Sequence, residues 1–189
     1  MNGNNPNFIY AYDDQARQII IINAETGERV VQKENRVLSI LSYLDEQNSE
    51  QKLRKFAVWC AHQTNTYIKP LQKKFFECAE QAIDKKIELQ RLQQLYDESE
   101  GKAIATDTVG LRQGSEKAPG FLASRECVNP DALEGAKNAA RFHCLWAEIN
   151  NQKDSQPEFT RIMDPAASKD IINQIEQKQV DYLLDLIGQ

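Results

Sequence analysis

The fold of this 189-residue chain is decided by residues 52–61, KLRKFAVWCA. Leu53, Phe56, Ala57 and Cys60 recur at spacings of three and four residues, which is the period of one face of an α-helix. A helix with such a broad apolar stripe has to bury it against other helices. We therefore expect a helical body built around this stretch.

Similar apolar periods continue on both sides of residues 52–61. Four further helices are expected, at residues 34–45, 71–96, 131–150 and 168–188. A polar linker, residues 151–167, precedes the last of them. The apolar stripe of that C-terminal helix favours docking on its own body over docking on another chain. Residues 34–189 are therefore predicted to form one helical body.

Residues 1–33, which precede the helices, are predicted to form a β-hairpin. Phe8–Tyr12 and Gln18–Asn23 are the strand candidates, because they are rich in β-branched and aromatic residues. Gly27 can adopt positive φ in a second turn, after which Arg29–Val31 can return as a short third strand. An isolated hairpin is marginal, so it should lean on the helices. The predicted fold is mainly α, an irregular helical bundle with an N-terminal β-hairpin.

Residues 99–130 interrupt the helical pattern. The segment holds four of the eight glycines and two of the six prolines, so we expect a long loop with at most a short helical turn. Such loops are usually functional or mobile. The glycines, hydroxyl groups and cations of Thr108–Lys117 could bind an anion. Their order is not that of a phosphate-binding P-loop, however, and a mobile surface loop is favoured.

The net charge of −5 argues against a general nucleic-acid coat protein, but it hides an uneven distribution. Residues 52–94 hold nine Lys and Arg against four Asp and Glu, a net charge of +5, so the remainder carries −10. A basic face here could bind an acidic protein or, as a less favoured alternative, nucleic acid. Internal pairing between the basic and acidic parts is the simplest interpretation, and all three stay open.

Cysteine chemistry is the remaining alternative. The four cysteines, at positions 60, 78, 127 and 144, are widely spaced and form no CxxC pair. Without a secretory signal or an apolar run long enough to span a membrane, we expect a cytoplasmic protein with reduced thiols and no membrane contact. Cys60 with His62, and His143 with Cys144, lack the spacing of zinc ligands. We therefore expect no metal, cofactor or catalytic residue, and a cysteine-dependent enzyme is the least favoured alternative.

Three short segments carry a resemblance to known proteins. The motif K-L-R-x-F-A-x-x-C at residues 52–60 resembles the first helix of a widespread group of uncharacterised bacterial and phage helical proteins. Residues 76–80, FECAE, and residues 179–188 are similar to their second element and to their short C-terminal helix. The pattern is also similar to that of a helical family of immunity proteins. The resemblance implies a helical body, carries no catalytic residue and leaves out the hairpin and residues 99–130.

Together these observations predict a non-enzymatic protein-interaction module. The resemblance implies an accessory or immunity-type protein of a bacterial or phage conflict system. We expect its partner to be another protein of acidic character, and the edge of the hairpin is a second candidate interface. The residues expected to contact the partner are Lys69, Lys73, Lys74, Lys85, Lys86, Arg112 and Lys117.

Overall fold

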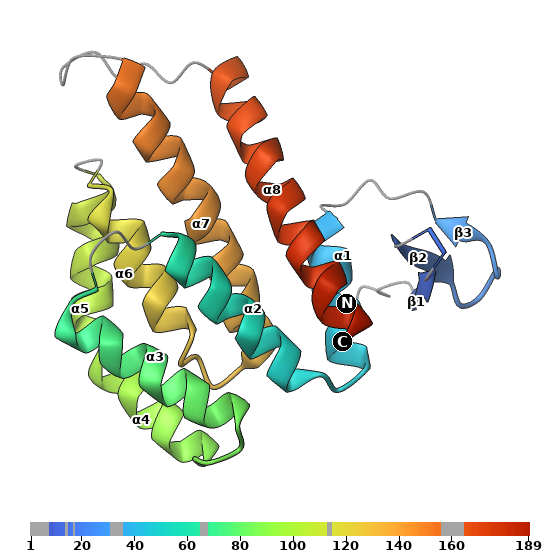
Figure 1. The fold of residues 1–189 in the computed structure, drawn as a ribbon, viewed down its shortest axis with the longest axis horizontal. Helices are drawn as coiled ribbons and strands as arrows, with labels where there is room; N and C mark the ends of the chain where they lie inside the picture. The colour runs from blue at the N-terminus through green and yellow to red at the C-terminus, as the bar shows by residue number, and fades with distance from the viewer. Residues whose placement is uncertain are drawn as a thin grey trace, which may run out of the picture.

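The computed structural model describes residues 8–13, 15–16, 18–30, 36–64, 68–112, 115–155 and 165–189. Within them a small antiparallel sheet precedes eight α-helices and one π-helical turn, so the predicted mainly α fold with an N-terminal hairpin is confirmed (Figure 1). The strands are β1 (Phe8–Asp13), β2 (Gln18–Asn23) and β3 (Arg29–Val30). The helices are α1 (Arg36–Glu46), α2 (Glu50–Gln63), α3 (Pro70–Ile83), α4 (Leu89–Glu98), α5 (Glu100–Ala105), the π-helical η1 (Thr106–Leu111), α6 (Lys117–Glu126), α7 (Ala132–Ser155) and α8 (Pro165–Gly188).

The three strands pair in the order β1-β2-β3, and β1 and β2 pack against α1. Ile19 and Ile21 are buried, whereas Ile20 and Ile22 on the opposite face are half-buried. The Tyr12 ring of β1 lies 6.3 Å from the ring of Tyr43 in α1. The run of four isoleucines is therefore explained by one sheet face that rests on the helical body.

Two hydrophobic clusters hold the helices together, and α2 and α7 contribute to both. The first cluster joins α1, α2, α7 and α8 with β2. The second joins α3, α4, α5 and α6 to the same two helices. In α8, Val180 and Leu183 are buried in the first cluster. The expected docking of the C-terminal helix on its own body is thus confirmed, and Figure 1 shows α8 beside α7 and α1.

The prediction of one helix over residues 71–96 is wrong, because a turn separates α3 from α4. Lys85 adopts a left-handed conformation with φ 56°. The N–H of Lys86 then donates to the carbonyl oxygen of Gln81 at 2.7 Å, which closes the end of α3. The apolar period continues across this turn, and lysine is not a residue that marks positive φ. The sequence pattern therefore does not reveal the break.

The expectation of a long loop over residues 99–130 is also wrong. The segment contains α5, η1 and α6, and every residue from Ala118 to Asn129 is buried. Pro119 lies in the first turn of α6, where a missing N–H breaks no helical hydrogen bond. A Cβ on Gly110 would lie 2.9 Å from Cβ of Ala118, so small residues are needed where η1 meets α6. Glycine and proline here serve close packing rather than a loop.

The expected linker over residues 151–167 is helical at both of its ends. Helix α7 continues to Ser155 and α8 begins at Pro165, a residue suited to the first position of a helix. Residues 156–164, the middle of the expected linker, lie outside the described residues. Although α7 and α8 have 24 residues each, no helix in the described ranges combines the length and apolar character that crossing a membrane requires.

Candidate functional site

The predicted basic face of residues 52–94 is partly used inside the molecule. Arg54 is buried, and its Nη1 donates to the carbonyl oxygen of Asn129 at 2.9 Å. On the surface, Lys73 and Lys86 each have a carboxylate nearby: Nζ of Lys73 lies 3.7 Å from Glu77, and Nζ of Lys86 lies 2.7 Å from Asp84. These cations are therefore partly neutralised by the chain itself.

The remaining predicted contact residues are spread over the surface. Lys69 precedes α3 and Lys85 follows it, so they are roughly 20 Å apart at the helical rise of 1.5 Å per residue. Lys74 is half-buried within α3, and Arg112 is exposed at the end of η1. The structure does not gather these residues into one basic face.

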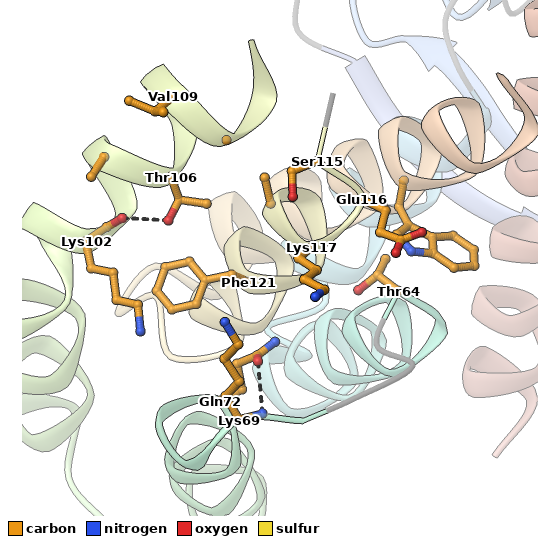
Figure 2. Close-up of a pocket in the computed structure, with 14 residues that line it drawn as sticks. Thr64, Lys69, Gln72, Lys102, Thr106, Val109, Ser115, Glu116, Lys117 and Phe121 are labelled. Carbon is orange, nitrogen blue, oxygen red and sulfur yellow. Dashed lines mark hydrogen bonds between the residues drawn. The ribbon is translucent and has the colours of Figure 1, made fainter. Parts of the chain in front are cut away.

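Two of the predicted residues, Lys69 and Lys117, do come together in one pocket of about 660 Å³. The pocket lies between the start of α3, the α5–η1 segment and α6 (Figure 2). Lys102 of α5, which sequence analysis did not single out, lines it as well. Among the described residues, none of these three lysines has an ion-pair partner within 4.0 Å. We call this site the lysine pocket.

The wall of the lysine pocket is largely apolar. Phe121 and Trp146 contribute aromatic rings, and the aliphatic part includes Val109. Nζ of Lys102 lies 4.9 Å from the centroid of the Phe121 ring, a cation–π distance. Figure 2 shows the side chain of Lys69 extending toward the same ring. The volume is within the range of small-molecule sites, which are usually apolar with a few polar groups.

Most polar groups of the pocket wall already have partners within the protein. The buried Gln72 donates from Nε2 to Oγ of Ser124 at 3.2 Å. The hydroxyl groups of Thr64 and Thr106 donate to backbone carbonyl oxygens one turn earlier, at 2.7 and 2.8 Å. These groups position the wall and leave the lysines as its principal hydrogen-bond donors.

Glu116 is the acidic residue of the pocket lining. With the Asn150 amide oriented so that both of its ends are bonded, its nitrogen donates to Oε2 of Glu116 at 2.8 Å. In that orientation its oxygen accepts from Nε1 of Trp146 at 2.9 Å. Three lysines against one glutamate leave the pocket lining with a net charge of +2.

One wall of the pocket is the π-helical turn η1, which supplies Thr106, Val109 and Gly110. Such turns are rare and occur frequently at functional sites. Val109 in this turn is 53% exposed, and Ile104 of the preceding helix α5 is 57% exposed. The lysine pocket therefore opens on a surface that carries both lysine ammonium groups and exposed apolar side chains.

Cys60 and Cys144 lie in environments that suppress thiolate chemistry. Burial raises the pKa of Cys60, and burial together with the nearby Glu176 raises the pKa of Cys144 to about 11. Burial, with the charge of Lys178, lowers the pKa of His143 to about 4. These two thiols are therefore protonated at neutral pH and poor nucleophiles. In the described ranges, no group of His, Cys, Asp and Glu side chains is arranged to hold a metal ion.

Comparisons with protein-family models, with curated proteins and with solved structures find no match to this chain. The resemblance to immunity proteins therefore stays a prediction, and the candidate site rests on the geometry of the lysine pocket.

Sequence reasoning missed Lys102, Phe121 and Trp146 as site residues. The first two lie in residues 99–130, the segment that the sequence marked as functional or mobile. The glycines and prolines of this segment therefore pointed to the site, although the loop that they predicted is helical. Trp146 belongs to an ordinary helical stripe, and no local pattern distinguishes it from a core residue.

Proposed function

We propose that this protein is a non-enzymatic interaction module that binds an acidic partner protein through the face on which the lysine pocket opens. The observation that carries the proposal is a set of three lysines around an apolar wall, none of which has an ion-pair partner in the part of the chain that the structure describes. Cations that the chain does not neutralise favour an acidic partner and speed its association.

Apolar side chains beside the lysines support the same proposal. Ile104 and Val109 are more than half exposed, and Ile68, next to Lys69, is 40% exposed. Protein interfaces combine apolar anchors with a polar rim, and a few anchors supply most of the binding free energy. The surface around the lysine pocket offers both components to a partner.

The biological role that we propose is that of an accessory or immunity-type protein in a bacterial or phage conflict system. This part rests on the sequence resemblance at residues 52–60, 76–80 and 179–188. An immunity protein acts by occupying its partner rather than by chemistry of its own. The raised pKa values of the Cys60 and Cys144 thiols agree with such a role, and a cytoplasmic location is part of the same proposal.

The test is capture of the partner from the native host with immobilised protein, followed by affinity measurement on the partner identified. The triple variant Lys69→Glu, Lys102→Glu and Lys117→Glu should weaken binding by tenfold or more. The matched control reverses three exposed lysines outside the pocket, Lys55, Lys85 and Lys86, and should bind almost normally. Equal losses in both variants would refute the assignment to the pocket face.

Binding of nucleic acid by this protein is tested by a gel-shift assay with oligonucleotides at low salt. A shift that weakens steeply as salt rises would favour the nucleic-acid alternative over an acidic protein. Absence of a shift at low salt would leave the acidic protein as the partner class.

A further inference from the structure

We infer that the lysine pocket is also a small-molecule site, which binds an amphipathic acid with a carboxylate or phosphate head and an apolar body. This goes beyond partner binding, because a pocket of about 660 Å³ is large enough to hold a small molecule without a partner protein. The inference shares its lysines with the proposed function but needs no partner protein, so the two can fail separately.

The head group follows from the donors that line the pocket. Lys69, Lys102 and Lys117 supply ammonium groups, which donate hydrogen bonds and cannot accept them. The complementary group is an anion that only accepts, as carboxylates and phosphates do. The net charge of +2 on the lining suits a singly or doubly charged head. A neutral or cationic head would leave the lysines unpaired.

The apolar body follows from the hydrogen bonds already made in the wall. Gln72, Thr64, Thr106 and Trp146 use their side-chain donors within the protein. A ligand body with many donors and acceptors of its own, such as a sugar, would find few partners there and would lose its bonds to water. An aliphatic or aromatic body instead gains from contact with the Phe121 ring and the aliphatic wall.

The position of Lys102 joins the two parts of the site. Its Nζ lies 4.9 Å from the centroid of the Phe121 ring, so a cation and an apolar contact surface occur within one ligand length. Figure 2 shows the side chains of Lys69, Lys102 and Lys117 grouped around this ring. A ligand that lays its body on Phe121 therefore brings its head within reach of the lysines.

The direct test is titration calorimetry of the isolated full chain with decanoate, below the concentration at which it forms micelles. We expect saturable binding of decanoate at one site. Decanol, which lacks the acidic head, and acetate, which lacks the apolar body, should each bind at least tenfold more weakly. Decyl phosphate distinguishes the two heads: tighter binding than decanoate assigns a phosphate, and weaker binding assigns a carboxylate. Absence of decanoate and decyl phosphate binding, or equal affinity for decanol, would overturn the inference.

Two variants locate the site. Replacing Lys69, Lys102 and Lys117 together by Gln should weaken decanoate binding by tenfold or more, whereas the same change at Lys55, Lys85 and Lys86 should leave it unchanged. Unchanged binding in the pocket variant would place the ligand elsewhere and refute the site.

Ala105→Trp provides a second variant that does not remove charge. Ala105 is exposed and lines the pocket, so an indole there should fill the entrance and abolish binding without disturbing the core. Ala24→Trp, in an exposed turn of the hairpin, is the matched control and should bind normally. Circular dichroism verifies that each variant is folded. Decanoate binding that survives Ala105→Trp would also count against the site.

Discussion

Helices α2 and α6 both pack against α7, but different side chains hold them there. Helix α2 presents an apolar stripe in which Leu53 and Phe56 are buried, and its opposite side keeps exposed polar residues. Helix α6 has neighbours on all sides, namely α2, α3, α5, η1 and α7. It buries the charged residues Arg125 and Glu126 together with its apolar ones.

The buried charges of α6 are held by a connected set of hydrogen bonds. Arg125 donates from Nε to Oγ of Ser99 at 3.0 Å, and its guanidinium lies 3.5 Å from the centroid of the Tyr96 ring. Glu126 accepts from the Tyr96 hydroxyl at 3.2 Å and from Asn129 at 2.9 Å. A helix without a solvent face needs such partners, because an unpaired buried charge is strongly unfavourable. Helix α2 buries one charge, Arg54, which donates to the carbonyl oxygens of Asn129 and Pro130. The rest of its buried face needs only volume and apolar area.

The largest effect is expected from Arg125→Leu in α6. Nη1 of Arg125 lies 3.6 Å from Oε1 of Glu126, and the substitution leaves that carboxylate buried without its cation. The free energy of unfolding in urea should fall by about 3–5 kcal/mol. Arg91→Leu, at an exposed site on α4, is the control and should change it by less than about 0.5 kcal/mol.

A double variant separates the charge from the packing in α6. Arg125→Leu combined with Glu126→Gln removes the unpaired charge but keeps a hydrogen-bond acceptor, so it should lose less stability than Arg125→Leu alone. A double variant that loses more would show that the cation does not compensate Glu126, and the contrast with α2 would fail.

At Leu53 of α2 we expect the response to depend on volume alone. Leu53→Ala should lower the free energy of unfolding by about 2–5 kcal/mol, because a fully buried side chain is replaced by a cavity. Leu53→Met conserves volume and should cost less than about 1.5 kcal/mol. Both changes in the free energy of unfolding are to be measured by unfolding in urea. Equal costs for the two substitutions would mean that Leu53 does not stabilise α2 through apolar packing.

One titratable group complicates the apolar contact between α2 and α7. His143 of α7 is buried, with its ring 5.5 Å from that of Trp59 in α2. Burial lowers its pKa from 6.5 to about 4, so the unfolded chain binds the proton more tightly than the folded one. The contribution of the neutral His143 ring to the free energy of unfolding is complete above pH 6.5. It is lost as the pH falls toward 4, and the loss amounts to about 3 kcal/mol.

The pH effect is measured as a difference between two proteins. Unfolding in urea at a series of pH values should show a steeper loss below pH 6.5 for the natural chain than for His143→Gln, since the carboxylates titrate in both. If the free energies of unfolding of the two proteins change in parallel with pH, His143 has the same pKa in the folded and unfolded chains.

The smallest effect concerns the close approach of α6 and α7. A Cβ on Gly135 would lie 2.6 Å from the backbone oxygen of Glu126, so Gly135→Ala requires a backbone shift. The expected cost is about 1–3 kcal/mol, seen as a lower melting temperature. Gly101→Ala, in α5 with open space around the new methyl group, should be neutral or slightly stabilising. If both variants melt alike, α6 tolerates more movement than its packing implies.

Sequence patterns located the amphipathic elements well. The strand expected at Gln18–Asn23 is found at those residues, and the helix expected at residues 34–45 is found at Arg36–Glu46. Each has one buried face, so its apolar residues alternate with a regular period. Helix α6 has no such period because almost all of it is buried. The turn at Lys85 lacks the residue type that would have marked it.

The candidate site was predictable in part. Lys69 and Lys117 were expected to contact a partner, and both line the lysine pocket. Lys102 was not expected to contact a partner, although it lies between Lys69 and Lys117 in the sequence. The pocket brings together segments more than 30 residues apart, and charge counts along a sequence do not show which cations will share one space.

The sequence by itself determined the mainly α body, the β-hairpin before it and the uneven distribution of charge, because each is written in local periods and composition. Only the tertiary structure decided that α6 is a buried helix, that Arg54 is internal and that three lysines line one pocket with Phe121. The physical reason is that burial on all sides and the meeting of distant side chains depend on how helices pack, and packing is not encoded in any short stretch of the chain.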